Sequence, residues 1–189
     1  MLLQFSVTNH RSIKNTAVIS MKAAADKSMK ECLITPDGKK KIVPVMAIYG
    51  ANAAGKSNVI HALLLMREMV CGNYAKPLKG EELPYEPFAF VDEQIEPTAL
   101  EVIYYYEGIK YAYGFSFNNE RIISEYLYHW PNGREALIFN REKDQYEFRE
   151  SVQEQLTLAG RTSENRLYLT SSNEWNCVQT ENAYLWFQK

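Results

Sequence analysis

Residues 50–57 read GANAAGKS and match the pattern G-x-x-x-x-G-K-S/T at every fixed position. This pattern is typical of a phosphate-binding loop when a buried strand runs into it and a helix runs out of it. The apolar run at residues 43–49 predicts such a strand, covered on both faces in a mainly parallel sheet. Apolar residues recur at helical spacing over residues 58–70, and Gly72 follows as a natural end. We therefore expect a strand, a loop and a helix in this order.

The residue types in the loop suit the chemistry of a triphosphate. Gly50 and Gly55 allow the unusual dihedrals and close approach by which several backbone N–H groups converge on phosphate oxygens. The start of the helix adds its positive end. Lys56 is placed to reach the β- and γ-phosphates, and the hydroxyl of Ser57 can ligate Mg²⁺. The loop therefore predicts binding of a nucleoside triphosphate with Mg²⁺.

The composition is that of one globular domain or one large lobe. The chain has 189 residues, of which 46% are hydrophobic and 23% charged, so a real core is expected. A formal net charge of -2 argues against a general polyanion binder. No apolar run reaches the roughly 18 residues that span a bilayer, and no signal segment is visible, so we expect a cytoplasmic protein without membrane contact. Cys32, Cys71 and Cys177 are widely spaced and predict free thiols.

The chain divides into four segments. Residues 1–72 comprise a β-hairpin of alternating apolar and polar residues, followed by the strand, loop and helix. Residues 73–98 form a long proline-rich connection. Residues 99–149 alternate in runs separated by short turn sequences, which predicts an antiparallel β-meander. Residues 150–189 start a helical segment that we expect to be truncated, with an amphipathic helix from Glu181.

The tyrosines of the meander allow two interpretations. Thirteen tyrosines occur in the chain, largely in this region, and an aromatic surface could stack nucleic-acid bases. Tyr is also a good sheet former with one polar end, and we favour this second interpretation.

Hydrolysis needs more than a phosphate loop. A carboxylate at the end of a second buried strand holds Mg²⁺, and a neighbouring Glu usually activates water. Asp92 and Glu93 imitate this arrangement after four apolar residues, but they follow Pro87, and Pro is a poor opening for a central strand. We therefore assign no catalytic residue. The guanine-reading pattern N-K-x-D is missing from the sequence, which favours adenine as the base.

Four stretches together carry a family resemblance: residues 5–13 (FSVTNHRSI), 49–58 (YGANAAGKSN), 113–115 (YGF) and 125–128 (EYLY). They resemble AAA-family ATPases of the OLD-like kind, which belong with the ABC, SMC and RecF ATPases. The resemblance implies an α/β fold, the first lobe of an ABC/SMC-like P-loop NTPase head with an antiparallel β-meander subdomain. The second lobe of such heads supplies the Walker B strand, the catalytic Glu, the signature motif and the switch His, and these would lie beyond Lys189.

The resemblance also implies site residues. Arg11 matches an Arg that reaches the nucleotide in SMC-like heads, although an exposed turn Arg is an equal alternative. Relatives often have Phe where His10 stands, and a Mg²⁺-sensing Gln near the position of Glu174. Ser57 would hold the metal. The residues implied around the phosphates, besides Arg11, are Gly50, Ala51, Asn52, Ala53, Ala54, Gly55, Lys56, Ser57 and Asn58.

Three functional hypotheses follow. In the first, the chain binds ATP and Mg²⁺ as the first lobe of an ATPase head, and hydrolysis requires the second lobe. The resemblance adds a head-to-tail homodimer, a nuclease partner, DNA, and defence against phage. In the second, the chain is a non-hydrolysing module whose nucleotide state regulates a nuclease or another partner. In the third, it is a compact enzyme that uses Asp92 and Glu93. Under the first hypothesis an apolar face should be exposed for the second lobe, and we expect Trp186 and Phe187 in it.

Overall fold

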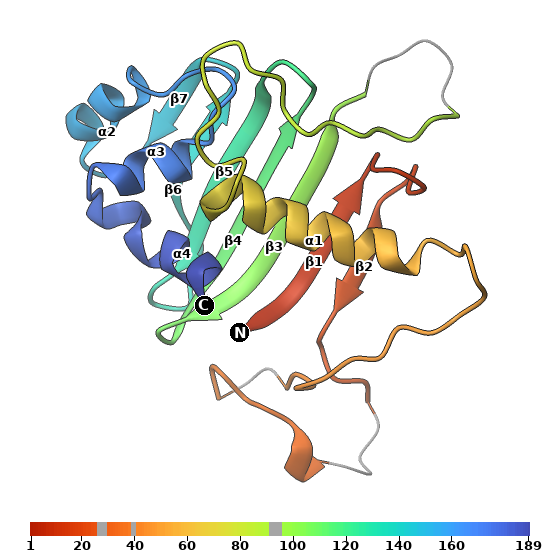
Figure 1. The fold of residues 1–189 in the computed structure, drawn as a ribbon. Helices are drawn as coiled ribbons and strands as arrows, with labels where there is room; N and C mark the ends of the chain where they lie inside the picture. The colour runs from red at the N-terminus through yellow and green to blue at the C-terminus, as the bar shows by residue number, and fades with distance from the viewer. Residues whose placement is uncertain (26–29, 39–40, 91–95) are drawn as a thin grey trace.

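The computed structural model describes residues 1–25, 30–38, 41–90 and 96–189. A seven-stranded sheet in the order β2-β1-β3-β4-β5-β6-β7 forms its centre, and all neighbouring strands are antiparallel (Figure 1). The described part of the chain is therefore a mixed α/β structure. The strands are β1 (Leu2–Thr8), β2 (Ala17–Ser20), β3 (Thr98–Tyr106), β4 (Ile109–Phe117), β5 (Ile122–Trp130), β6 (Ala136–Glu142) and β7 (Gln145–Phe148).

The predicted hairpin and meander are both confirmed, and the structure joins them into one sheet. β1 pairs with β2 on one side and with β3 on the other, with Phe5 opposite Val102. This pairing is possible because the connection between α1 and β3 returns the chain to the edge of β1. The hairpin and the meander consequently share one core.

The helices lie on one face of this sheet. α1 crosses the sheet over β1 and β3, α2 and α3 lie toward β5–β7, and α4 packs against α1, α3 and β3 (Figure 1). The predicted helix after the loop is confirmed, and Gly72 caps its end by donating its N–H to the carbonyl of Glu68 at 3.1 Å. The helices are α1 (Lys56–Cys71), α2 (Val152–Ala159), α3 (Tyr168–Glu174) and α4 (Val178–Gln188), with a 3₁₀ turn at Lys30–Cys32.

Phe187 belongs to the core, so the expectation that it is part of an exposed face is wrong, while Trp186 is partly buried. Phe187 is only 4% exposed, and the Trp186 ring stacks on Tyr104 with centroids 4.2 Å apart. The hydroxyl of Tyr104 donates to the carbonyl of Ala183 at 2.9 Å, which fixes α4 to β3. Apolar side chains at the end of α4 meet the sheet because the helix lies directly on it.

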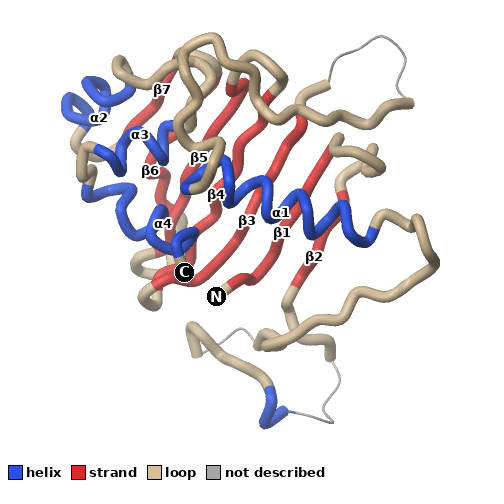
Figure 2. The backbone as a smooth tube through the Cα atoms, viewed as in Figure 1, coloured by secondary structure: helices blue, strands red, loops and turns tan. Residues whose placement is uncertain are grey.

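The buried strand predicted before the loop is also wrong. Residues 43–49 form no strand, and residues 44–54 are all exposed. The segment touches the rest of the fold through Ile42 and the N–H of Val43, which donates to Met21 at 2.8 Å. Pro44 then lacks an N–H, and no described strand lies beside the following residues to pair with them. Figure 2 shows this run passing outside the edge strand β2 before it enters α1.

Two stretches that carried the resemblance face each other across β4 and β5. Phe115 lies opposite Glu125, and Gly114 lies opposite Tyr126. A side chain on Gly114 would meet the Tyr126 hydroxyl at 2.5 Å, so the Tyr ring requires a residue without a Cβ there.

Glu125 anchors the helices to the sheet from a completely buried position. Its carboxylate accepts the N–H groups of Tyr168 and Leu169 at 2.6 and 2.9 Å and the hydroxyl of Tyr113 at 2.9 Å. Burial raises the pKa of this carboxyl, while the Arg141 guanidinium, 3.5 Å away, acts in the opposite direction.

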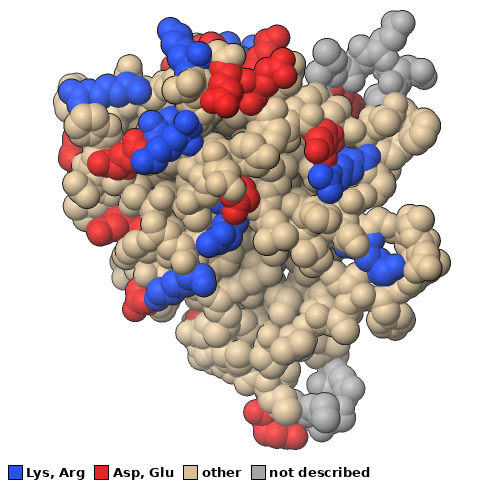
Figure 3. Space-filling view, viewed as in Figure 1, with Lys and Arg blue, Asp and Glu red and all other residues tan. Residues whose placement is uncertain are grey.

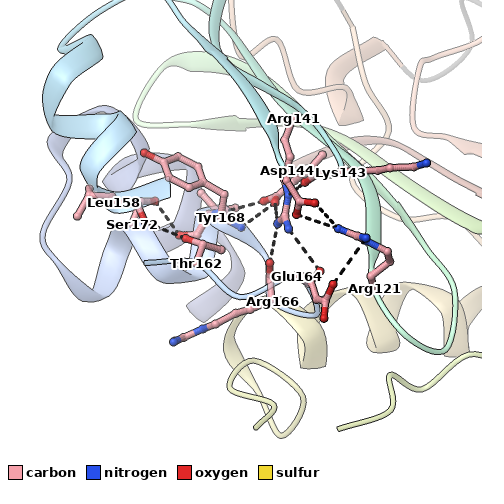
Figure 4. Close-up of polar contacts among 12 residues, drawn as sticks. Arg121, Arg141, Lys143, Asp144, Leu158, Thr162, Glu164, Arg166, Tyr168 and Ser172 are labelled. Carbon is pink, nitrogen blue, oxygen red and sulfur yellow. Dashed lines mark hydrogen bonds and ion pairs between the residues drawn. The ribbon is translucent and has the colours of Figure 1, made fainter. Parts of the chain in front are cut away.

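Arg141 extends this network to the segment before α3. It donates to the carbonyls of Lys143 and Arg166 at 2.7 Å and of Glu164 at 3.3 Å, and only 1% of its side chain is exposed (Figure 4). Arg121 adds ion pairs to Asp144 and Glu164 nearer the surface. The network joins β5, β6 and α3 into one rigid end of the molecule.

Candidate functional site

The loop before α1 curls through backbone conformations that favour glycine. Gly55 has φ +82° and Gly50 has φ +156°, and between them Ala53 has φ +62°. Gly55 is also the N-cap of α1, and no side chain caps that helix end. The first N–H groups of a helix have no carbonyl one turn earlier to bond, so they are available to an anion.

The Lys56 side chain folds back over the carbonyl groups at the start of the loop. Its Nζ donates to the carbonyl of Gly50 at 2.9 Å and to that of Ala51 at 2.5 Å. Ser57 follows it in the first turn of α1 and is exposed. The structure thus gathers a flexible cation, a hydroxyl and a free helix end at one place.

The turn between β1 and β2 lies against this loop. The Ser12 hydroxyl accepts a hydrogen bond from the side-chain amide of Asn58 at 2.7 Å. A side chain on Gly55 would come within 3.0 Å of the same oxygen. No local pattern predicts this contact of Ser12, because it joins residues that are more than forty positions apart.

Asn9 ties this turn to the proline-rich connection. Its side chain, 3% exposed, donates to the carbonyl of Glu96 at 2.5 Å and accepts from the N–H of Phe88 at 2.9 Å. Its own carbonyl accepts the Thr98 hydroxyl at 2.6 Å. Asn9 adopts φ +50°, a left-handed conformation that Asn tolerates better than most residues. The connection is therefore fastened beside the loop.

Arg11 makes two contacts with Glu86 in that connection. Its backbone N–H donates to the Glu86 carbonyl at 2.8 Å, and its guanidinium Nε pairs with the Glu86 carboxylate. The ion pair is partly exposed, and Arg11 itself has φ +51°. The Arg11 guanidinium lowers the pKa of the Glu86 carboxyl. Arg11 thus stands one residue from the contact between Ser12 and the loop.

His10 fills the inside of the same turn. It is 2% exposed, and neither ring nitrogen has a hydrogen-bond partner among the described residues. Burial lowers its pKa, and the nearby Arg11 adds to that effect, while Glu86 opposes it. The ring is therefore kept neutral as a packing element.

A family comparison covers the loop and most of the remaining chain. The sequence model of the family described as "AAA domain, putative AbiEii toxin, Type IV TA system" matches residues 45–188. The chain belongs to this family of AAA domains. Membership of an AAA-domain family indicates nucleotide binding and ATPase-like activity. A comparison with curated proteins found no match.

Among the acidic candidates of this AAA domain, the structure describes only the position of Glu174. Asp92 and Glu93 lie outside the described residues. Glu174 pairs with Lys76 and Arg166 at 2.7 and 2.6 Å. It ends α3, which bonds to the far end of α1 through Thr170, and the 16 residues of α1 separate that end from the loop by about 24 Å. Glu174 therefore lies too far from the loop of the same chain to contact a Mg²⁺ bound there.

The surface of the AAA domain shows no concentrated charge on the face that carries the helices. Figure 3 shows cationic and anionic side chains intermixed across the described part of that face. Within the described ranges, no group of three His, Cys, Asp or Glu residues could hold a metal ion. None of the helices that the structure describes is both long and apolar enough to cross a membrane.

Proposed function

We propose that this chain binds ATP with Mg²⁺ through residues 50–58, as the first lobe of an ABC/SMC-like ATPase head of the OLD-like kind. The observation that carries the proposal is the joint geometry of the loop. Gly50 and Gly55 adopt positive φ, α1 begins without a side-chain cap, and Lys56 lies over the loop carbonyls. Such a site offers backbone donors and one cation to a polyphosphate.

Each residue has a defined task in this proposal. The backbone of residues 50–55 and the first turn of α1 donate to the phosphate oxygens. Lys56 exchanges its carbonyl partners for the phosphates, and Ser57 ligates Mg²⁺ together with phosphate oxygens and waters. Mg²⁺ would neutralise phosphate charge when it is bound. Asn58 keeps its bond to Ser12 and so holds the hairpin turn against the loop.

Hydrolysis in this proposal requires a second lobe, and exposed apolar residues lead into the loop. Val45 is 78% and Tyr49 is 92% exposed, and on α1 Ile60 and Leu64 are 45% and 51% exposed. Apolar surface of this extent is expected where another layer of structure packs. We propose that the second lobe supplies strands beside residues 43–49 and covers this face of α1.

The test is ATP binding and turnover by the chain with Mg²⁺, measured by isothermal titration calorimetry and phosphate release. We expect binding without turnover, and loss of binding by at least tenfold in Lys56→Ala. Lys79→Ala, an exposed lysine in the connection, is the charge-matched control and should bind like the unmodified chain. Unchanged binding in Lys56→Ala would refute the proposal. Turnover by the chain alone that Asp92→Ala abolishes would instead favour the compact enzyme.

A non-hydrolysing module that regulates a nuclease or another partner is the alternative reading of binding without turnover. The two are separated by adding a second lobe, because only an ATPase head then gains phosphate release. The proposal also includes head-to-tail dimerisation around two ATP molecules and a role in phage defence or on DNA. The family description names a toxin of a toxin–antitoxin system, which accords with a defence role.

A further inference from the structure

The Arg11 guanidinium is paired with the Glu86 carboxylate, in the hairpin turn that contacts Asn58 of the proposed phosphate site through Ser12. Two bonds join the residues, one from the backbone N–H of Arg11 and one from its side chain. Arg11 precedes Ser12, whose hydroxyl contacts Asn58 of α1. A cation that an ATP bound at residues 50–58 would attract is thus already paired with a carboxylate from the proline-rich connection.

The pair is well suited to exchange. The side chains are 38% and 53% exposed, and an ion pair with this exposure shifts an equilibrium by no more than about fivefold. A triphosphate carries several negative charges and offers Arg a bidentate partner. The backbone of Arg11 is held in a left-handed conformation by its neighbours, so the side chain can change partner while the turn stays in place.

We propose that Glu86 is a latch that competes with ATP for Arg11. On binding, the guanidinium moves from the Glu86 carboxylate to the phosphates, and the connection around residues 84–90 loses one of its attachments to the hairpin turn. The backbone N–H of Arg11 keeps its bond to the Glu86 carbonyl, and Asn9 keeps its bonds to Phe88 and Glu96. Binding of ATP at the loop therefore loosens the attachment of the proline-rich connection to the hairpin turn. This inference rests on the proposed binding of ATP.

The test is a double-mutant cycle on the affinity for a fluorescent ATP analogue with Mg²⁺. Glu86→Gln should bind about two- to fivefold more tightly than the unmodified chain, and Arg11→Ala more weakly. The double variant should bind like Arg11→Ala, because Glu86 then has no cation to withhold. Glu82→Gln, which removes another exposed carboxylate of the connection, should leave the affinity unchanged.

A second readout is hydrogen exchange of residues 84–90. Exchange should rise when ATP is added to the unmodified chain and should not change with ATP in Arg11→Ala.

The outcomes separate the latch from ATP binding itself. The latch is overturned if Glu86→Gln leaves the affinity unchanged, or if it tightens binding equally in the Arg11→Ala background, since the effect is then general repulsion. Lys56→Ala reports on the loop independently, and its failure to weaken binding refutes the loop rather than the latch. No binding by the unmodified chain and Glu86→Gln alike would overturn both proposals.

Discussion

The polar groups at the two ends of this molecule differ in their burial and in their hydrogen bonding. At the end formed by β5–β7 and α3, Glu125 and Arg141 are 0% and 1% exposed, and both are bonded to several partners. At the loop end, residues 44–54 are exposed and the start of α1 has no side-chain cap. The first end therefore uses its polar groups to hold the fold, whereas the second leaves them available to a ligand.

This difference distinguishes a conspicuous structural cluster from a candidate site. Glu125 and Arg141 form a buried ion pair, and the pKa of the Glu125 carboxyl is raised by burial, which are features that often mark a functional site. Its donors and acceptors are directed at backbone groups of the same fold, so no group remains for a substrate. The loop end has exposed residues and an uncapped helix start, and for this reason we propose the binding site there.

The largest expected effect on stability comes from breaking the buried end. Arg141→Met keeps an apolar stem but leaves Glu125 buried without its cation. It also removes the Arg141 donor from the carbonyls of Lys143, Arg166 and Glu164, of which that of Glu164 keeps the N–H of Ile122 at 2.9 Å. Loss of one partner of a buried ion pair costs about 3–5 kcal/mol in the free energy of unfolding. Urea denaturation followed by circular dichroism measures this change.

Arg149→Met is the matched control on the same end of the sheet. Arg149 pairs with Glu147 at 2.8 Å, but its side chain is 67% exposed, so we expect a loss of no more than about 1 kcal/mol. Equal losses in the two variants would show that the buried network is not what stabilises this end.

A smaller effect, which depends on pH, is expected at the hairpin turn. Burial lowers the pKa of His10 in the folded chain, so the unfolded chain binds the proton first. Stability should therefore fall as the pH decreases through about 6.5, the ordinary histidine value. The His10→Phe variant has no group at this position that takes up a proton, and it lacks the two unpartnered ring nitrogens. We expect its free energy of unfolding at pH 6 to be about 1 kcal/mol higher than that of the unmodified chain.

Thermal unfolding from pH 8 to pH 5 measures this difference. The stability of His10→Phe should decline less over this range than that of the unmodified chain. Burial also lowers the pKa of His129, which both chains retain, so a residual slope is expected. Parallel pH profiles for the two chains would show that His10 is not the proton acceptor.

The sequence predicted what local patterns encode. The loop and α1 follow from the fixed positions of residues 50–57, and the alternation of residues 99–149 fixes the meander. The apolar run at 43–49 was misleading, because burial of a strand depends on neighbouring strands that no described residue provides. An apolar run indicates a segment that packs against other residues, but it does not identify which residues these are.

The contacts of the hairpin turn could not be predicted. Asn9, Ser12 and Glu86 act through bonds between segments that are distant in sequence, and two of these contacts involve backbone groups that carry no residue signature. Phe187 likewise looked like part of an exposed face, and only the packing of α4 on the sheet shows that it is buried. Sequence patterns therefore predicted the loop, but not the contacts of Asn9, Ser12 and Glu86 in the turn beside it.

Substitutions on the apolar face of α1 should change stability least. They should instead change the self-association of the chain. Ile60→Glu combined with Leu64→Glu replaces two side chains that are 45% and 51% exposed, so the free energy of unfolding should change by no more than about 0.5 kcal/mol per site. The unmodified chain should self-associate at high concentration through this face and residues 45–49, and the double variant should be more monomeric in sedimentation velocity. The two added carboxylates lie on the same side of the helix as Ser57, so circular dichroism of the double variant serves as the control that the fold is kept. A monomeric unmodified chain would mean that these side chains do not by themselves form an interface, and the contrast between the closed and open ends would then rest on the loop alone.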